Sequence, residues 1–230
     1  VESWMTETAM VPVVTTLLSE SFEGAFPPAG WVAHNVDGGG SQWARSIANP
    51  HTGNASALHN YSSAGMQDGW LVTPAIAVPT VGTPELTFWE YTSYPTWYEK
   101  HSLWVCTGGC DTPPANWTEV AEFASPTAAW RQQTVNLSAY AGQTVYLAFR
   151  YEGTFADAWY VDDVLLVETL VSPMDVPISW SLTTDISGTY QVWLDEMYSP
   201  VTITVSYPNH AQGQANVTLP AQNTTTPDSD

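Results

Sequence analysis

Apolar and polar positions alternate with a period of two in several short stretches of this chain. The clearest stretches are Val201–Tyr207 and Val145–Tyr151, and Leu86–Tyr91 and Trp159–Val167 are similar. Such alternation puts one strand face in a core and the other in solvent, which is typical of antiparallel sandwiches. Helical periodicity is nearly absent. The pattern therefore predicts an all-β protein.

Two prolines within Val171–Pro177 interrupt this strand-rich pattern and predict a domain boundary. We expect an extended N-terminal arm over 1–19, a large domain over 20–170, a small domain over 171–222 and a polar tail over 223–230. The arm is too apolar to be fully solvated, so we expect it to pack as a strand. Its apolar side chains are Val11, Val13, Val14, Leu17 and Leu18.

Charge limits the possible partners. The 230 residues carry 23 acidic side chains against four Lys and Arg, a net charge of −19. This excess repels phosphate backbones and anionic lipids, so we expect neither nucleic-acid nor membrane-surface binding. No apolar run is long enough for a membrane span. We expect each arginine to pair with an acid, with Arg150 as the best candidate.

Cysteines and sequons indicate an oxidising compartment. Cys106 and Cys110 flank a turn-like Thr-Gly-Gly, so a local disulfide is expected; free thiols are the alternative, and a metal site lacks a second cysteine pair. A chain that starts at Val1 also suggests that an export signal has been removed. We predict an extracellular or cell-surface glycoprotein. The candidate glycosylation sites are Asn54, Asn60, Asn116, Asn136, Asn216 and Asn223.

An ordered set of short motifs runs from Glu20 to Val167. It comprises Glu20-Ser-Phe-Glu23, Gly30-Trp31, Trp43, Asp68-Gly-Trp-Leu-Val-Thr-Pro74, Leu86-Thr-Phe-Trp89, Trp130, Val145-Tyr-Leu-Ala-Phe-Arg150 and Val161-Asp-Asp-Val164. This stretch resembles the cleaved-adhesin, or choice-of-anchor J, family of bacterial surface modules, which are related to MAM domains. The resemblance implies a jelly-roll β-sandwich that binds or adheres without catalysis.

The stretch Thr183–Tyr207 resembles the second half of a carboxypeptidase regulatory-like domain, a small Ig-like β-sandwich. The opening strands of that domain are not recognisable here. A sandwich without them has an exposed sheet edge, and such an edge favours pairing with another strand. The arm could fill this gap in the next copy, which would build a head-to-tail fibre, or it could fold back on its own chain.

Family resemblance also implies structural Ca²⁺, held by residues that match Glu23, Asp37, Asp162 and Asp163. Ca²⁺ needs six to eight oxygen ligands, but the loop that is often Asp-rich in relatives is Gly38-Gly-Gly40-Ser41 here. Adjacent strand residues also face opposite sides, so at most one of Asp162 and Asp163 should reach a core-facing site. The alternative is that these carboxylates accept hydrogen bonds from backbone amides.

Aromatic residues offer a second candidate site. Most family-position tryptophans are expected to fill the sandwich core. These are Trp31, Trp43, Trp70, Trp89, Trp130 and Trp159. A loop with Tyr91, Tyr94, Trp97 and Tyr98 could instead stack on sugars.

Catalytic motifs are lacking. The chain has no H-E-x-x-H, G-x-S-x-G, P-loop or G-x-G-x-x-G sequence, and we predict that it is not an enzyme. The sequence therefore predicts a structural or adhesive extracellular protein that could form fibres by strand donation. The alternatives are a carbohydrate-binding module and an accessory domain of a secreted hydrolase.

Overall fold

The computed structural model describes residues 2–37, 40–123, 127–181, 201–206 and 213–218. Its strands are β1 (Glu2–Glu20), β2 (Val32–Asn35), β3 (Trp43–Ser46), β4 (Ser56–His59), β5 (Met66–Val72), β6 (Ile76–Ala77), β7 (Thr83–Thr92), β8 (Lys100–Cys106), β9 (Thr118–Glu122), β10 (Thr127–Asn136), β11 (Thr144–Thr154), β12 (Trp159–Ser181), β13 (Val201–Ser206) and β14 (Gly213–Val217). Two short 3-10 helices, η1 (Pro95–Trp97) and η2 (Ser138–Tyr140), complete the described elements. The all-β prediction is confirmed.

The chain divides into two compact units. One, which we call the sandwich unit, is Val13–Leu170; the other, the terminal unit, combines Val1–Pro12 with Val171–Asp230. The second division falls where the proline-rich stretch begins. The N-terminal division falls after Pro12, within β1. The expected arm is therefore the first part of a strand that continues into the sandwich unit.

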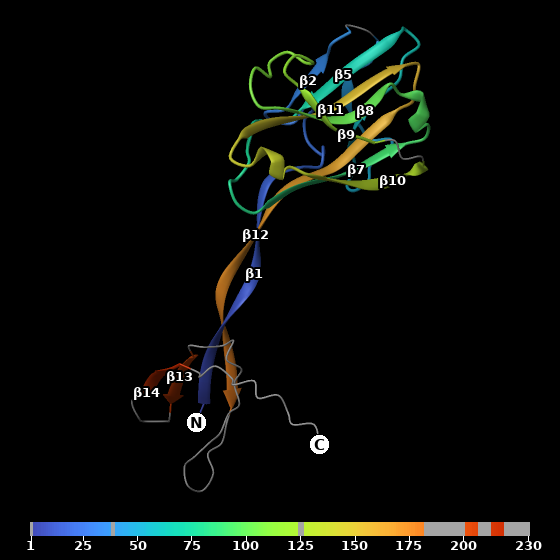
Figure 1. Cartoon of the computed structure of the whole chain (residues 1–230). Coiled ribbons are helices and arrows are strands. Elements are labelled where there is room, and N and C mark those ends of the chain that lie inside the picture. The colour runs from blue at the N-terminus through green and yellow to red at the C-terminus, as the bar shows by residue number, and fades with distance from the viewer. Residues whose placement is uncertain (1, 38–39, 124–126, 182–200, 207–212, 219–230) are drawn as a thin grey trace, which may run out of the picture. The chain divides into compact units, whose positions relative to one another are not determined.

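Two antiparallel sheets form the sandwich unit (Figure 1). In the first sheet β10 pairs with β7, β7 with β12, β12 with β4 and β4 with β3. In the second sheet the order is β2, β5, β11, β8 and β9, with β6 paired to β11. Side chains from both sheets meet in one hydrophobic core, as the period-two pattern predicts.

Burial along β7 follows this period closely. Leu86 and Phe88 are fully buried, whereas Thr87 and Trp89 face outward and are half-buried. Each fully buried side chain of this kind contributes about 1.5–3 kcal/mol of hydrophobic free energy. The outer residues are therefore the ones free to take part in binding.

Close packing at Gly69 joins the two sheets. A Cβ at this position would collide with the imidazole of His59, so only glycine fits. The indole N–H of Trp43 donates to the Gly69 carbonyl at 3.1 Å, and the His59 ring stacks on Tyr151 with centroids 4.0 Å apart. A buried polar and aromatic layer therefore lies at this end of the core.

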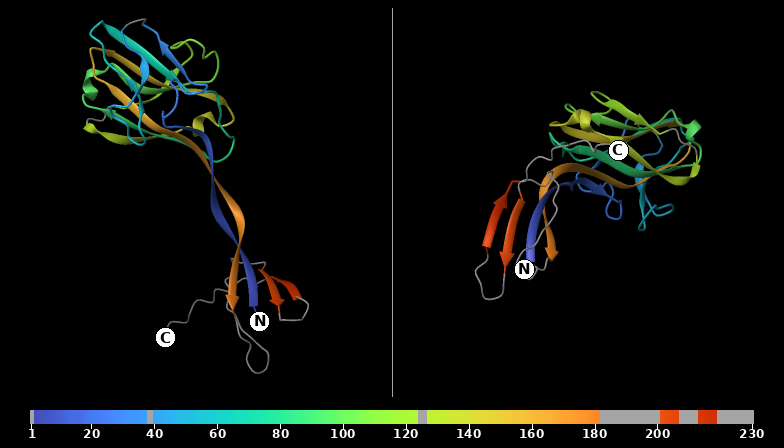
Figure 2. Two further views of the ribbon diagram at one scale, coloured as in Figure 1. Left: turned by 180° about the vertical axis from the view of Figure 1, so that it is seen from behind. Right: turned by 60° about the horizontal axis from the view of Figure 1, so that its bottom comes forward.

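The terminal unit contains a sheet in which β1 lies between β12 and β13, followed by β14 (Figure 2). The pairing of β1 with β13 is antiparallel, with Glu2 opposite Ser206 and Trp4 opposite Thr204. The arm thus pairs with the C-terminal part of its own chain. The described residues of this unit form a single sheet, so the Ig-like sandwich over 171–222 stays a prediction.

The apolar residues of the arm differ in how deeply they are buried. Leu17 and Leu18 pack against the core of the sandwich unit. Val13 and Val14 are exposed, and Val11 is half-buried. The part of the arm that pairs with β13 is therefore its first residues, not the Val11–Leu18 stretch expected from apolarity.

Candidate functional site

Three loops gather at the end of the sandwich unit where β12 begins. They are residues 60–65 after β4, residues 93–99 between β7 and β8, and residues 155–158 between β11 and β12. The start of β12 pairs with the end of β4, and the Thr154 N–H donates to the Glu99 carboxylate at 3.0 Å. We call the exposed Tyr61, Tyr94, Trp97 and Phe155 of these loops the aromatic end.

Tyr94 and Trp97 form a parallel stacked pair within this surface. Their ring centroids are 4.1 Å apart and their planes differ by 9°. The η1 turn fixes this spacing, because the Trp97 N–H donates to the Tyr94 carbonyl at 3.0 Å. Tyr94 is 49% exposed and Trp97 is 53% exposed, so a flat, ordered aromatic surface faces solvent.

Tyr61 and Phe155 form a second exposed pair at the same end. Their rings meet edge to face at 5.5 Å, and Phe155 is 60% exposed. Phe155 has a φ of 52°, a conformation that is unusual for an aromatic residue and costs on the order of 1–3 kcal/mol. An unusual backbone conformation that exposes an apolar ring makes this position a candidate for binding.

The predicted four-residue sugar platform is divided in the structure. Tyr98 points inward: its hydroxyl donates to the Ala158 carbonyl at 2.8 Å and accepts from the Thr92 hydroxyl at 2.8 Å. Tyr91 lies on the outer face of β7, where it packs against Trp130 and Tyr160. Only Tyr94 and Trp97 of the predicted set therefore form a common surface.

Titratable side chains are buried beneath the aromatic end. Burial raises the pKa of Glu90 to about 7, although Gln133 and the Trp159 indole both donate to its carboxylate, at 2.6 and 2.9 Å. Burial also lowers the pKa of His59 to about 3 and of His101 to about 4. Burial therefore favours the neutral form of both imidazoles at physiological pH.

Three of the predicted calcium ligands hold one loop. Glu23 accepts the backbone N–H groups of Asn54 and Ala55 at 2.8 and 3.1 Å, and the hydrogen bond from Asn54 lowers the pKa of Glu23. Asp162 accepts the His51 N–H at 2.9 Å. These bonds match the alternative in which backbone amides, rather than a cation, satisfy the carboxylates.

Asp162 and Asp163 do not face opposite sides as expected. Asp163 lies 2.6 Å from the His51 imidazole and accepts the Thr52 hydroxyl at 2.7 Å, while Asp162 accepts the backbone of the same two residues. A bulge between Asp162 and Leu165 and a φ of 47° at Asp163 break the alternation. Both carboxylates consequently reach one loop.

Asp37, the remaining predicted ligand, follows β2 in the second sheet. Across the described part of the chain, no three His, Cys, Asp or Glu side chains are grouped so that they could hold a metal ion. The oxygens of Glu23 and Asp162 already accept hydrogen bonds. Calcium binding therefore stays a prediction.

Outer faces of both sheets carry tryptophans. Trp31, Trp43 and Trp159 fill the sandwich as predicted. For Trp89 and Trp130 the prediction was wrong: they are half-buried on the outer face of the first sheet, where His51 packs against both. An outward position on β7 or β10 leaves no access to the core.

The prediction that Trp70 fills the sandwich core was also wrong: it is buried in a second small cluster on the outer face of the second sheet, with Trp117 and Cys106. Arg150 lies over its ring at 4.9 Å and makes a bidentate ion pair with Asp68, with both N···O distances 2.9 Å. This pairing confirms the expectation for Arg150. Arg45 instead donates to backbone carbonyls.

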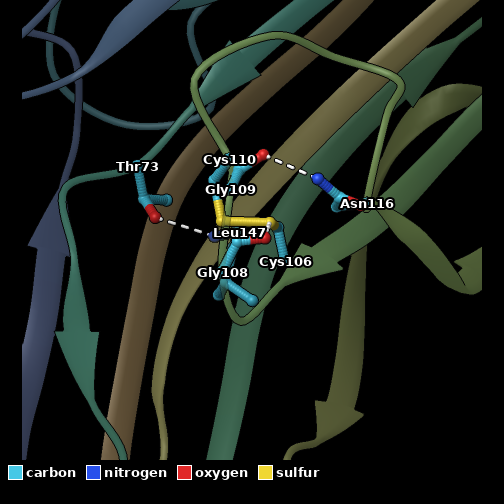
Figure 3. Close-up of a disulfide and its surroundings, with 7 residues drawn as sticks. All are labelled: Thr73, Cys106, Gly108, Gly109, Cys110, Asn116 and Leu147. Atoms are coloured by element: carbon cyan, nitrogen blue, oxygen red, sulfur yellow. Dashed lines mark hydrogen bonds between the residues drawn. A yellow bond between two sulfur atoms is a disulfide. The ribbon is translucent and has the colours of Figure 1, made fainter.

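The loop over this cluster is closed by a disulfide between Cys106 and Cys110 (Figure 3), as the spacing predicts. Asn116 donates to the Gly109 carbonyl at 3.1 Å and ties the loop to its far side. Among the sequons, the asparagines at 54, 60, 116, 136 and 216 are exposed, and Asn223 lies outside the described residues. Their glycosylation stays a prediction.

Comparison with known proteins agrees with this geometry. The chain matches the Cleaved Adhesin Domain family over residues 15–166. It is 31% identical over 179 residues to Hemagglutinin A of Porphyromonas gingivalis, a match that covers 65% of this chain and 7% of the relative. It is 30% identical over 224 residues to Lys-gingipain of the same species, covering 78% of this chain and 12% of the relative.

Among solved structures, the K1 cleaved adhesin domain of Lys-gingipain from P. gingivalis W83 aligns with a TM-score of 0.51 and 26% identity, covering 66% of this chain and 97% of that domain. The chain thus spans only a small part of the curated relatives but nearly all of one of their domains. No helix in the described ranges is long and apolar enough to cross a membrane. The sandwich is a jelly roll of this type, and the chain belongs to the cleaved adhesin domain family.

Proposed function

We propose that this protein is an exported, non-catalytic adhesive module that binds glycans through its aromatic end. The observation that carries the proposal is the stacked Tyr94–Trp97 pair, two half-exposed rings held parallel at 4.1 Å. Sugar rings present C–H faces that pack well on aromatic faces, and rigid aromatic side chains lose little entropy on binding. A second exposed pair, Tyr61–Phe155, enlarges the surface.

The net charge of the protein and its family membership support this choice of ligand. The net charge of −19 disfavours anionic partners, whereas neutral glycans have no such penalty. One relative carries the name Hemagglutinin A, which is consistent with attachment to cell-surface ligands. Membership of an adhesin family and the exposed aromatic surface both favour binding over catalysis.

A glycan array tests the proposal. The native protein should bind a subset of neutral glycans, and Trp97→Ala should weaken that binding by about ten-fold or more, because one exposed aromatic stack is worth roughly 0.5–1.5 kcal/mol beyond its buried area. Ile47→Ala, at an exposed residue outside the aromatic end, is the matched control and should leave binding unchanged. Glycan binding that survives in Trp97→Ala would remove the support for this surface.

We also infer that the chain can assemble head to tail by strand exchange. The supporting observation is that β1 occupies a place between β12 and β13, so residues from the start of the chain complete a sheet built by its end. The same antiparallel pairing of Glu2–Trp4 with β13 could form between two copies if the arm of one copy takes this place in the next, as in domain swapping. This would yield open fibres.

Deletion of residues 1–12 tests assembly. The shortened chain should keep a folded sandwich unit, because the core of that unit starts with Leu17, but it should lose any polymers seen by electron microscopy. A synthetic peptide of residues 1–12 should bind the shortened chain and block polymer growth in the full chain. Strictly monomeric full-length protein at all concentrations would rule out strand exchange.

A further inference from the structure

A concave surface lies on the outer face of the second sheet, away from the aromatic end. It is a groove of about 170 Å³ over the start of β2, the end of β5 and the start of β11. The disulfide loop supplies one wall through Cys110 and Asp111. We call it the sheet groove, and its lining includes Val32, His34, Val72, Thr73, Asp111 and Tyr146.

Uncommitted polar groups converge on this groove. Within the described ranges, no hydrogen bond or ion pair is formed by the side chains of His34, Asp111 or Tyr146. His34 and Tyr146 are half-buried, and burial lowers the pKa of His34. The groove therefore offers a carboxylate acceptor, a phenol hydroxyl and a neutral imidazole that can both donate and accept.

The walls that hold these groups are rigid. Val72 is buried at the end of β5, paired with Val32 on one side and with β11 on the other. The hydroxyl of Thr73 donates to the Pro74 carbonyl and accepts the Leu147 N–H at 3.0 Å, and Figure 3 shows Thr73 beside the disulfide that anchors Cys110. Binding residues on such pre-organised elements pay little ordering entropy.

We propose that the sheet groove binds one uncharged, hydroxylated ring, the size of a single sugar residue. Its volume is below the roughly 300 Å³ of clefts that take drug-sized ligands. A mixture of donors and acceptors beside the apolar Val32 and the Tyr146 ring suits a ligand with hydroxyl groups and an apolar face. Asp111 and the absence of a cationic side chain among the lining residues disfavour anions.

The sheet groove is separate from the aromatic end, and ligand binding in the groove does not depend on glycan binding at the aromatic end. Saturation-transfer NMR with the methyl glycosides of glucose, galactose, mannose and N-acetylglucosamine tests it directly. At least one glycoside should receive saturation from the Tyr94→Ala/Trp97→Ala variant, in which the aromatic end is removed. Adding Val32→Phe to this variant should fill the groove and abolish the signal, whereas adding Val81→Phe, at an exposed valine elsewhere, should not.

Tyr146→Phe keeps the ring but removes its hydroxyl. It should raise the dissociation constant by about five-fold, as expected for the loss of one neutral hydrogen bond. The proposal is overturned by either of two results: no glycoside receives saturation from Tyr94→Ala/Trp97→Ala, or the signal persists when Val32→Phe is added to that variant. Competition by a small organic cation such as methylammonium would also overturn the assignment of an uncharged ligand.

Discussion

Replacing Glu90 with glutamine should change how the stability of this protein depends on pH. Glu90 is 1% exposed, and burial raises its pKa to about 7 from an ordinary value of 4.5. A raised carboxyl pKa means that the folded state holds the proton more tightly than the unfolded state. The stability that protonated Glu90 contributes should therefore be lost as the pH rises from 4.5, and this loss should level off above about pH 7.

The expected magnitude follows from these two values. One pKa unit corresponds to about 1.4 kcal/mol, so ionisation of Glu90 should cost roughly 3 kcal/mol across its full range. Between about pH 5 and pH 8, we expect the unfolding free energy of Glu90→Gln minus that of the wild type to rise by roughly 2–3 kcal/mol. The buried histidines are present in both proteins, so their contribution cancels in this difference.

Urea unfolding followed by tryptophan fluorescence at a series of pH values measures this difference. Glu85→Gln removes one carboxylate from the outer face of the same strand and controls for the change in net charge. A Glu90→Gln difference that stays constant from pH 5 to pH 8 would refute the reasoning, because it would mean that Glu90 titrates alike in the folded and unfolded states.

Four further predictions concern stability. Because burial lowers the pKa values of His59 and His101, the melting temperature of Glu90→Gln, which lacks the opposing contribution of Glu90, should fall progressively as the pH drops below about 6.5, where the unfolded imidazoles gain protons first; a flat profile of that variant down to pH 4 would contradict their burial as neutral groups. Arg150→Met should lower the unfolding free energy by about 3–5 kcal/mol in urea, since it leaves the buried Asp68 without its partner, and an effect below about 1 kcal/mol would count against that pair. Replacing Cys106 and Cys110 with alanine should lower the unfolding free energy by about 2 kcal/mol through loss of loop closure, measured in the same assay. As a control, a reducing agent should not change the unfolding free energy of this variant. If the family-implied Ca²⁺ binds near Asp163, chelation should lower the melting temperature by several degrees, whereas identical melting curves with and without chelator would mean that the loop is held by hydrogen bonds alone.

Strands and the disulfide could be predicted because they depend on local sequence. The alternation in Val145–Tyr151 is kept in β11, and only three residues lie between the paired cysteines. The alternation rule failed at Asp163, where a left-handed backbone conformation turns the side chain toward His51. Nothing in the Val161–Val164 sequence distinguishes a bulge from a regular strand, and the loop residues that the two carboxylates contact lie more than 100 positions earlier in the chain.

Half of the aromatic end was found from sequence and half was missed. Tyr94 and Trp97 are close in the chain, so their clustering was visible. Tyr61 and Phe155 come from loops that only the pairing of β4 with β12 brings together, and neither lies in a motif. The outward position of Trp89 was equally hidden, since tryptophan is compatible with both faces of a strand.

A titration followed by the indole N–H resonances of the protein tests most directly whether Tyr94 and Trp97 contact the ligand. With a glycan selected on the array, the Trp97 resonance should shift in proportion to occupancy, together with backbone amides of residues 60–65, 93–99 and 155–158. The buried Trp70 indole should stay unchanged. Shifts confined to other faces, with Trp97 unaffected at saturation, would contradict the account.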